Sequence, residues 1–107
     1  MMNEEQMQAL GEKVVDVLHS IYDPEIPVDI YELGLIYDVR VSEDADIEID
    51  MTLTSPSCPV AESMPEEVRE KVSSLDEAKE VKVIMVFEPT WTKEMMSEEA
   101  KLELGFL

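Results

Sequence analysis

The chain has 107 residues, 45% of them hydrophobic, which suits one globular domain over residues 1–107 and excludes a disordered acidic tail. It carries 26 acidic against 8 basic residues, a formal net charge of −18. This charge argues against binding to duplex nucleic acid or to anionic membrane surfaces, because both need a basic protein face.

The sequence also bears on location. No apolar run approaches the roughly 20 residues of a membrane-spanning helix. The N-terminus, with Glu4 and Glu5, is acidic and lacks the basic and apolar regions of a signal peptide. A single cysteine allows no internal disulfide. Together these features predict a cytoplasmic protein.

A helix is predicted near the N-terminus. Asn3 and Gln6 have the spacing of a capping box. Apolar residues then recur three or four positions apart and form one stripe: Met7, Leu10, Val14, Val17, Leu18 and Ile21. Gly11 weakens this helix by up to about 1 kcal/mol relative to Ala. The only histidine, His19, falls near the helix end, where a cation complements the dipole; as a metal ligand or base it would need partners that the neighbouring sequence does not supply.

An acidic connection follows. Pro24 and Pro27 stop the first helix, and residues 29–34 suit a single helical turn with Gly34 as its left-handed end. The carboxylates that cluster here belong to Asp23, Glu25 and Asp29. A hard-metal site is one interpretation. We favour a solvated, turn-forming role, because Asp side chains readily bond to nearby N–H groups.

Two strands come next. Residues 35–41 are rich in β-branched and aromatic side chains, and residues 47–54 alternate strictly between apolar and polar. The alternation places Ile47, Ile49, Met51 and Leu53 toward a core, and Glu48, Asp50, Thr52 and Thr54 on the other face. The short connection predicts an antiparallel hairpin.

A second helix is predicted after Cys58, with Pro59 in its first turn. Its buried stripe consists of Val60, Met64, Val68 and Val72. Because Pro65 interrupts the pattern, the helix either kinks there or restarts with Ser63 as a new cap; we favour one kinked helix ending near Ser74.

The rest of the chain completes the sheet. Residues 81–87 form a third strand, and a strand–helix–strand unit with a right-handed crossover makes it parallel to the second. Thr92 or Ser97 can cap a last helix that Gly105 ends. The expected fold class is α+β: a two-layer α/β arrangement in the order α-β-β-α-β-α, with a three-stranded mixed sheet covered by helices on at least one face.

The segment around Cys58 contains the side chains best suited to a chemical function. If the cysteine lies where the strand ends and the helix begins, backbone N–H groups and the helix dipole favour its thiolate, which is the reactive and metal-binding form. The supporting loop consists of Thr54, Ser55, Ser57 and Pro59. A buried structural cysteine is the alternative interpretation.

Other chemistries lack their usual partners. There is no Cys-x-x-Cys pair, no Gly-rich phosphate loop, and no histidine near Cys58 in the sequence. A permanent zinc site or iron–sulfur cluster needs several thiolate or imidazole ligands. Iron, sulfur or a cluster bound through Cys58 would therefore be held transiently and shared with a second subunit, a partner protein or a small thiol.

Several spaced motifs together resemble the PaaD/SufT-type metal–sulfur cluster assembly family, whose eukaryotic relatives belong to the cytosolic iron–sulfur assembly machinery. The motifs lie at residues 23–30, 33–37, 51–54 and 58–59, with a tail at 91–92, 96–100 and 104–105. The resemblance covers nearly the whole chain. Thr90, between Pro89 and Trp91, and Pro65 depart from the family's usual pattern.

The resemblance implies the same α-β-β-α-β-α order and an auxiliary, non-enzymatic role in the maturation of iron–sulfur proteins. It maps the family's reactive cysteine onto Cys58 and its acidic motif onto Asp23 and Glu25. The implied partners are the iron–sulfur assembly machinery and apo client proteins. No permanent cofactor is expected, and a homodimer is one arrangement that would complete a shared site.

Two other classes of function remain open. One is a thiol-dependent redox or nucleophilic enzyme that uses Cys58. The other is an acidic protein-interaction module in which the surface around Trp91 binds a basic partner and Cys58 is structural. A role for Trp91 in the core fits its residue type equally well.

Overall fold

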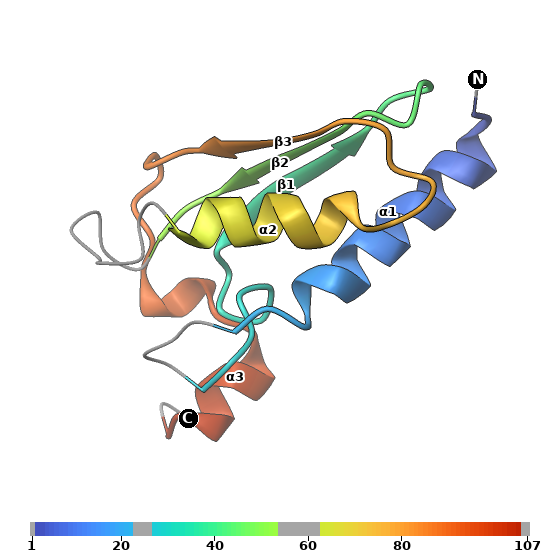
Figure 1. Cartoon of the computed structure of the whole chain (residues 1–107). Helices are drawn as coiled ribbons and strands as arrows, with labels where there is room; N and C mark the ends of the chain where they lie inside the picture. The colour runs from blue at the N-terminus through green and yellow to red at the C-terminus, as the bar shows by residue number, and fades with distance from the viewer. Residues whose placement is uncertain (1, 23–26, 54–62, 106–107) are drawn as a thin grey trace.

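A three-stranded sheet with two helices against one face organises the molecule (Figure 1). The computed structural model describes residues 2–22, 27–53 and 63–105. Its elements are α1 (Glu4–Leu18), β1 (Ile36–Val41), β2 (Ile47–Met51), α2 (Ser63–Ser73), β3 (Val81–Met85), the short 3-10 helix η1 (Lys93–Met95) and α3 (Glu98–Glu103). The predicted order of helices and strands is confirmed, with η1 in addition. Among the described residues, no helix is both long and apolar enough to cross a membrane.

The sheet is mixed, as predicted. Its strand order is β1-β2-β3, with β1 antiparallel and β3 parallel to β2. Ile49 in the central strand lies opposite Val39 on one side and Val83 on the other. A register shift between Ile36 and Asp38 marks a bulge in β1. The parallel pair is joined through α2, as the crossover rule requires.

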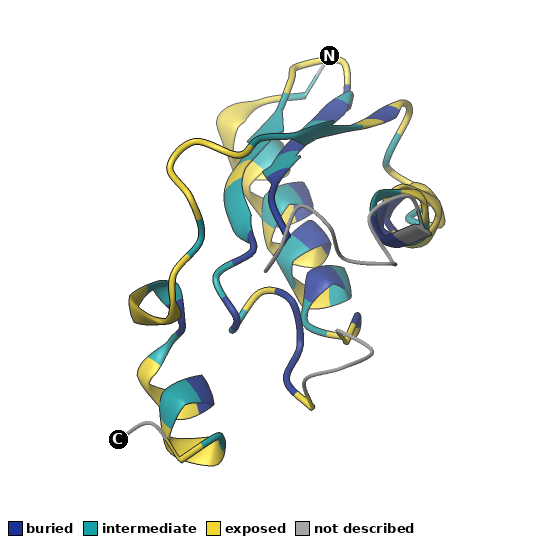
Figure 2. Cartoon of the chain, turned by 90° about the vertical axis from the view of Figure 1, so that its left-hand side faces the viewer, coloured by how far each residue is buried: buried dark blue, intermediate teal, exposed yellow. Residues whose placement is uncertain are grey.

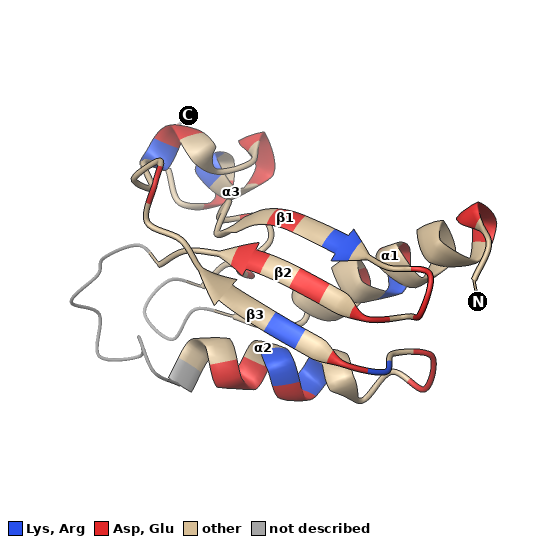
Figure 3. Ribbon diagram, turned by 90° about the horizontal axis from the view of Figure 1, so that it is seen from above, with Lys and Arg blue, Asp and Glu red and all other residues tan. Residues whose placement is uncertain are grey.

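The core lies between the sheet and the helices α1 and α2, which share one face (Figures 1 and 3). The sheet contributes Ile47, Ile49, Met51 and Leu53, all buried as the alternation predicts. The helices contribute Leu10, Val14 and Leu18 from α1, and Met64, Val68 and Val72 from α2. The predicted stripes are therefore confirmed at these positions, whereas Met7 and Val17 are only half-buried.

The ends of α1 follow their sequence signals. The Gln6 N–H donates to Asn3 Oδ1 at 2.8 Å, and the Asn3 N–H donates to Gln6 Oε1 at 2.9 Å, so the predicted capping box is present. The helix ends at Leu18 with His19 as its C-cap. Ile21, predicted as part of the helical stripe, is buried but lies beyond that end.

The helix α2 is described from Ser63, so Pro65 is the third described residue of this helix. It ends at Ser73, one residue before the predicted end. Pro59 and Val60, predicted for the beginning of this helix, lie outside the described residues. Whether the helix is kinked at Pro65 or restarts at Ser63 therefore remains a prediction from the sequence.

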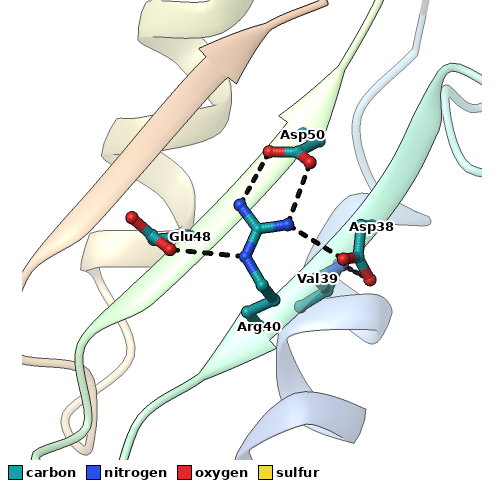
Figure 4. Close-up of polar contacts among 5 residues, drawn as sticks. All are labelled: Asp38, Val39, Arg40, Glu48 and Asp50. Atoms are coloured by element: carbon teal, nitrogen blue, oxygen red, sulfur yellow. Dashed lines mark hydrogen bonds and ion pairs between the residues drawn. The ribbon is translucent and has the colours of Figure 1, made fainter.

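The face of the sheet opposite the helices carries an ion-pair network (Figure 4). The Arg40 guanidinium donates to both carboxylate oxygens of Asp50, at 2.9 and 2.8 Å. It also donates to Asp38 at 2.9 Å and to Glu48 at 3.3 Å. These hydrogen bonds lower the pKa of Asp50 and raise that of Arg40.

One end of this second face is covered by the C-terminal segment. The Tyr37 hydroxyl, on β1, donates to the Pro89 carbonyl oxygen at 2.7 Å and lies 3.5 Å from Met95 Sδ. Thr52, which the alternation places on the polar side, forms a side-chain hydrogen bond with Tyr37 and is only 1% exposed. Figure 2 shows how burial is distributed over the elements.

Candidate functional site

The carboxyl end of the parallel pair β2/β3 is the edge of the sheet where the predicted thiol segment begins. The chain leaves β2 through Leu53 and returns at Ser63, the first described residue of α2, and both positions lie at this edge (Figure 1). Crevices outside the carboxyl ends of parallel strands commonly bind ligands. The amino-terminal end of α2 faces the same edge, and its dipole favours negative charge there.

Most of the residues predicted for the site fall in two segments outside the described residues. They are Cys58 with its supporting Thr54, Ser55, Ser57 and Pro59, and the acidic Asp23 and Glu25. Their roles remain predictions.

The structure describes the residues that flank both segments: Thr52 and Leu53 before the first, Met64 after it, and Tyr22 and Pro27 around the second. Thr52, Leu53 and Met64 are buried, so the thiol segment is anchored in the core at both ends.

A turn at residues 29–34 connects the acidic segment to this edge. The N–H of Leu35 donates to Ile30 O and that of Gly34 to Tyr31 O, both at 3.1 Å, which is the hydrogen-bond pattern of a Schellman end. Gly34 has φ +80°, so the predicted left-handed glycine is confirmed. The Thr52 N–H then donates to Leu35 O at 2.8 Å, which links the turn directly to the end of β2.

Asp29, the described member of the acidic motif, shapes this turn. Its Oδ2 accepts the N–H groups of Tyr31 at 3.1 Å and of Glu32 at 3.0 Å, so the predicted turn-forming role is confirmed. The predicted solvated position is wrong, because Asp29 is only 9% exposed. The reason is tertiary: His19 Nδ1 from the end of α1 lies 3.2 Å from the same oxygen and covers it.

His19 lies at the end of α1, as the sequence predicts. It also contacts side chains that the sequence does not reveal as its neighbours. Its Nδ1 lies 3.8 Å from Glu32 Oε1 in addition to its contact with Asp29. Its ring is tilted against that of Tyr31, with centroids 4.6 Å apart. These partners are at least ten residues away in the sequence, so local spacing carries no signal for them.

Trp91, predicted for a partner surface, is half-buried and packs against the core. Its Nε1–H donates to Leu33 O at 2.8 Å, and the Ser97 N–H donates to Glu32 O at 2.8 Å. A Cβ on Gly34 would lie 2.3 Å from Met95 O, so the chain segment before α3 packs directly on the turn. The C-terminal segment thus contacts the turn at three points.

A small acidic cavity of about 130 Å³ lies where the turn meets α3. Four carboxylates line it: Asp29 and Glu32 from the turn, and Glu99 and Glu103 from α3. Tyr22 and Pro27, which flank the acidic segment, also line it. Asp29, the described member of the predicted acidic motif, therefore shares this cavity with two carboxylates of α3. Sequence reasoning missed Glu99 and Glu103, because nothing in their local pattern distinguishes them from ordinary helix-start and surface carboxylates.

The described residues contain no group of three or more His, Cys, Asp or Glu side chains placed to hold a metal ion. The chain has one cysteine and one histidine in all.

Comparison with known proteins gives consistent matches. The family described as "Iron-sulfur cluster assembly protein" matches residues 11–84. The Fe-S protein maturation auxiliary factor of Porphyromonas gingivalis is 54% identical over 106 residues, which cover 99% of this chain and 100% of that protein. The Fe-S protein maturation auxiliary factor YitW of Bacillus subtilis is 44% identical, over 92% of this chain and 96% of its own length.

A solved structure has the same fold. The domain of unknown function DUF59 from Bacillus anthracis superposes with a TM-score of 0.90 and is 39% identical, covering 98% of this chain and 100% of that one.

Proposed function

The chain belongs to the iron–sulfur cluster assembly protein family, and from that premise we propose that it is an auxiliary factor in the maturation of iron–sulfur proteins. The observation that carries the proposal is the 54% identity, over essentially the full length of both chains, to a protein named for this role. The relatives are named as auxiliary factors and not as enzymes, in keeping with a protein that assists a transfer and does not turn over a substrate.

The proposal gives Cys58 the contact with the cargo, which is iron, sulfur or a cluster in transit. Its support is the geometry of the segment's ends: the thiol segment starts at the carboxyl end of β2 and returns at the amino-terminal end of α2. A helix amino terminus lowers the pKa of a nearby thiol and so favours the metal-binding thiolate. Because the chain has only one cysteine and one histidine, the remaining ligands of the cargo come from outside the chain.

The partners follow from that incomplete ligand set. We propose that the iron–sulfur assembly machinery or an apo client protein supplies the missing ligands, with a second copy of the chain or a small thiol as the other sources. The acidic cavity, together with the half-buried Trp91, suits contact with a basic surface of such a partner. The proposal places this work in the cytoplasm.

Complementation in a strain that lacks the gene tests the role. The wild-type chain should restore the activity of iron–sulfur enzymes, whereas Cys58→Ser should not, although its circular dichroism and melting temperature stay the same. Ser73→Ala, at an exposed position of α2, is the matched control and should complement fully. Full complementation by Cys58→Ser would remove the thiol from the proposal, and failure of the wild-type chain to support any iron–sulfur enzyme would remove the role itself.

Two measurements in vitro test the chemistry. Anaerobic purification, followed by iron and sulfide analysis and absorbance spectroscopy, should give substoichiometric cargo that Cys58→Ser lacks. Alkylation rate against pH should have its midpoint below the ordinary thiol value of about 8.5. A midpoint at that value would show that the helix does not activate this thiol.

A further inference from the structure

A second concave surface lies away from the site, between α1 and β1. It is a groove of about 710 Å³ whose floor is apolar. Met7, Gly11 and Val15 line it from α1, and Val39 and Val41 line it from β1. All five are half-buried, so the floor is open to solvent.

The groove exists because β1 is the outer strand of the described sheet. Val39 and Val41 pair with Ile49 and Ile47 of β2 and share their face. The two isoleucines are fully covered, whereas the two valines remain partly exposed because none of the described strands lies beyond them. The floor is therefore the uncovered margin of the hydrophobic core.

Gly11 keeps this margin open. A Cβ at this position would meet only Val41 Cγ2, at 3.9 Å, which is an ordinary van der Waals contact. Packing therefore does not require glycine here, and a glycine inside a helix costs about 1 kcal/mol relative to alanine. What the glycine does provide is the absence of a side chain in the middle of the groove.

The rim of the groove has one sign of charge. Glu4, Glu12 and Asp16 line it, and its lining contains no Lys or Arg. All three carboxylates are exposed, and none takes part in an ion pair within the described parts of the chain. The acidic residues of α1 are visible in Figure 3. An apolar floor with an unpaired acidic rim is complementary to a basic amphipathic segment.

The edge of β1 favours a helical partner over an added strand. The Val39 N–H donates to Asp38 Oδ1 at 3.0 Å, so this backbone donor already has an acceptor (Figure 4). A charged side chain on an outer strand also opposes strand pairing. From Glu4 to Asp16 the groove follows α1 for about 18 Å, the length of roughly three helical turns.

We propose that this groove docks a basic amphipathic helix of a partner protein. Its apolar face would lie on Met7, Gly11 and Val15, and its Lys or Arg side chains would pair with Glu12 and Asp16. The groove is separate from the Cys58 segment, so the proposal stands whether or not the thiol carries iron or sulfur. A second copy of this chain is a poor occupant, because each copy carries a net charge of −18.

Peptide titration with the full chain tests the proposal. The probe is a fluorescent leucine–lysine peptide of about three helical turns, and the comparison is the same peptide with glutamate in place of lysine. The lysine peptide should bind and the glutamate peptide should not. In 15N-labelled protein, the lysine peptide should shift the amide signals of Val15, Val39 and Val41.

Three variants separate the groove from general charge attraction. Glu12→Lys/Asp16→Lys should raise Kd about tenfold. Gly11→Leu, which leaves the net charge unchanged and fills the floor, should raise it to a similar extent. The control Glu70→Lys/Glu98→Lys changes the net charge equally, at exposed positions of α2 and α3 that line neither the groove nor the acidic cavity. It should leave Kd within about twofold, because charges away from the groove are screened.

The result that overturns the proposal is equal weakening by the control pair and the groove pair, or peptide-induced shifts that avoid α1 and β1. A concentration-dependent dimer in sedimentation that the groove variants disrupt would make the occupant a second copy and overturn the basic partner. Circular dichroism of each variant verifies that binding is lost without loss of the fold.

Discussion

The two faces of the sheet are made of alternating residues of the same strands but are stabilised in different ways. On the helix-covered face, Ile47, Ile49 and Met51 of β2 are at most 1% exposed. On the opposite face, Glu48 and Asp50 keep contact with solvent and pair with Arg40. Apolar burial is worth far more than pairing between exposed charges. The covered face therefore determines the register of β2, and substitutions on the opposite face should lower the free energy of unfolding less.

The strongest test of this difference replaces one isoleucine on each face. Ile49→Ala should lower the free energy of unfolding by about 4 kcal/mol, because it leaves a cavity in the closed core. Ile84 pairs with Asp50 on the opposite face and is partly exposed, so Ile84→Ala should cost only about 1 kcal/mol. Urea denaturation followed by circular dichroism measures both. Equal losses would contradict the unequal roles of the two faces.

The next test concerns the end of the opposite face that the C-terminal segment covers. Gly34→Ala should cost about 2 kcal/mol or more, because its backbone is left-handed and its Cβ would lie 2.3 Å from Met95 O. The fluorescence of Trp91 should shift to the red as its contact with Leu33 loosens. Gly105→Ala is the matched control: its φ is also +80°, but its Cβ would meet nothing within 4 Å. It should cost about 1 kcal/mol and leave the fluorescence unchanged.

Tyr37→Phe tests the same covered end of the sheet with a smaller expected loss of stability. It removes the hydrogen bond to Pro89 O and should cost about 1 kcal/mol at pH 8. Burial raises the pKa of Tyr37, against the lowering effect of its hydrogen bond with Thr52. Since the folded pKa lies above the unfolded one, the neutral phenol stabilises the fold at low pH. That contribution is lost as the pH rises above about 10 through the folded pKa.

Denaturation at pH 8 and pH 11 measures this effect. The advantage of the wild-type chain over Tyr37→Phe should shrink at the higher pH. Tyr22→Phe, which removes an exposed phenol, should leave the free energy of unfolding at pH 8 unchanged. A constant difference between wild type and Tyr37→Phe across this range would contradict the role of burial.

The smallest effect is expected from Asp50→Asn on the solvated part of the opposite face. Hydrogen bonds from Arg40 hold the pKa of Asp50 below its usual range. A folded pKa below the unfolded one stabilises the protein above about pH 3.9, and this contribution is lost as the pH falls through the folded value. The variant should melt slightly below the wild type at pH 7, and the gap should close in acid. Asp44→Asn controls for the loss of one carboxylate, and a gap that persists in acid would exclude the ion pair as its cause.

Much of the architecture can be predicted because its signals are local. The strict alternation of β2, the capping box of Asn3 and Gln6, and Gly34 at a left-handed position each depend on a few neighbouring residues. The parallel pairing of β2 and β3 follows from the chirality of a strand–helix–strand unit. The family resemblance, carried by motifs along the whole chain, is confirmed by the family match over residues 11–84.

The candidate site could be predicted only in part. The sequence singles out Cys58, Asp23, Glu25 and Asp29, but it assigns Asp29 a solvated place that His19 in fact covers. It shows Gly11 as a weak point of a helix and does not show that β1 supplies the other wall of a groove. Each miss involves contacts between elements far apart in the chain, for which spacing carries no information.

The sequence by itself determined the order of the elements, which face of β2 is buried, and the presence of a single cysteine in the segment between β2 and α2. Periodicity, caps and covalent continuity act over a few residues and can be read without a fold. Only the tertiary structure decided that Glu99 and Glu103 of α3 line one cavity with Asp29, that Thr52 is buried, and that the margin of the core opens between α1 and β1. Those features arise where separate elements meet, because burial and charge there depend on the packing of the whole chain.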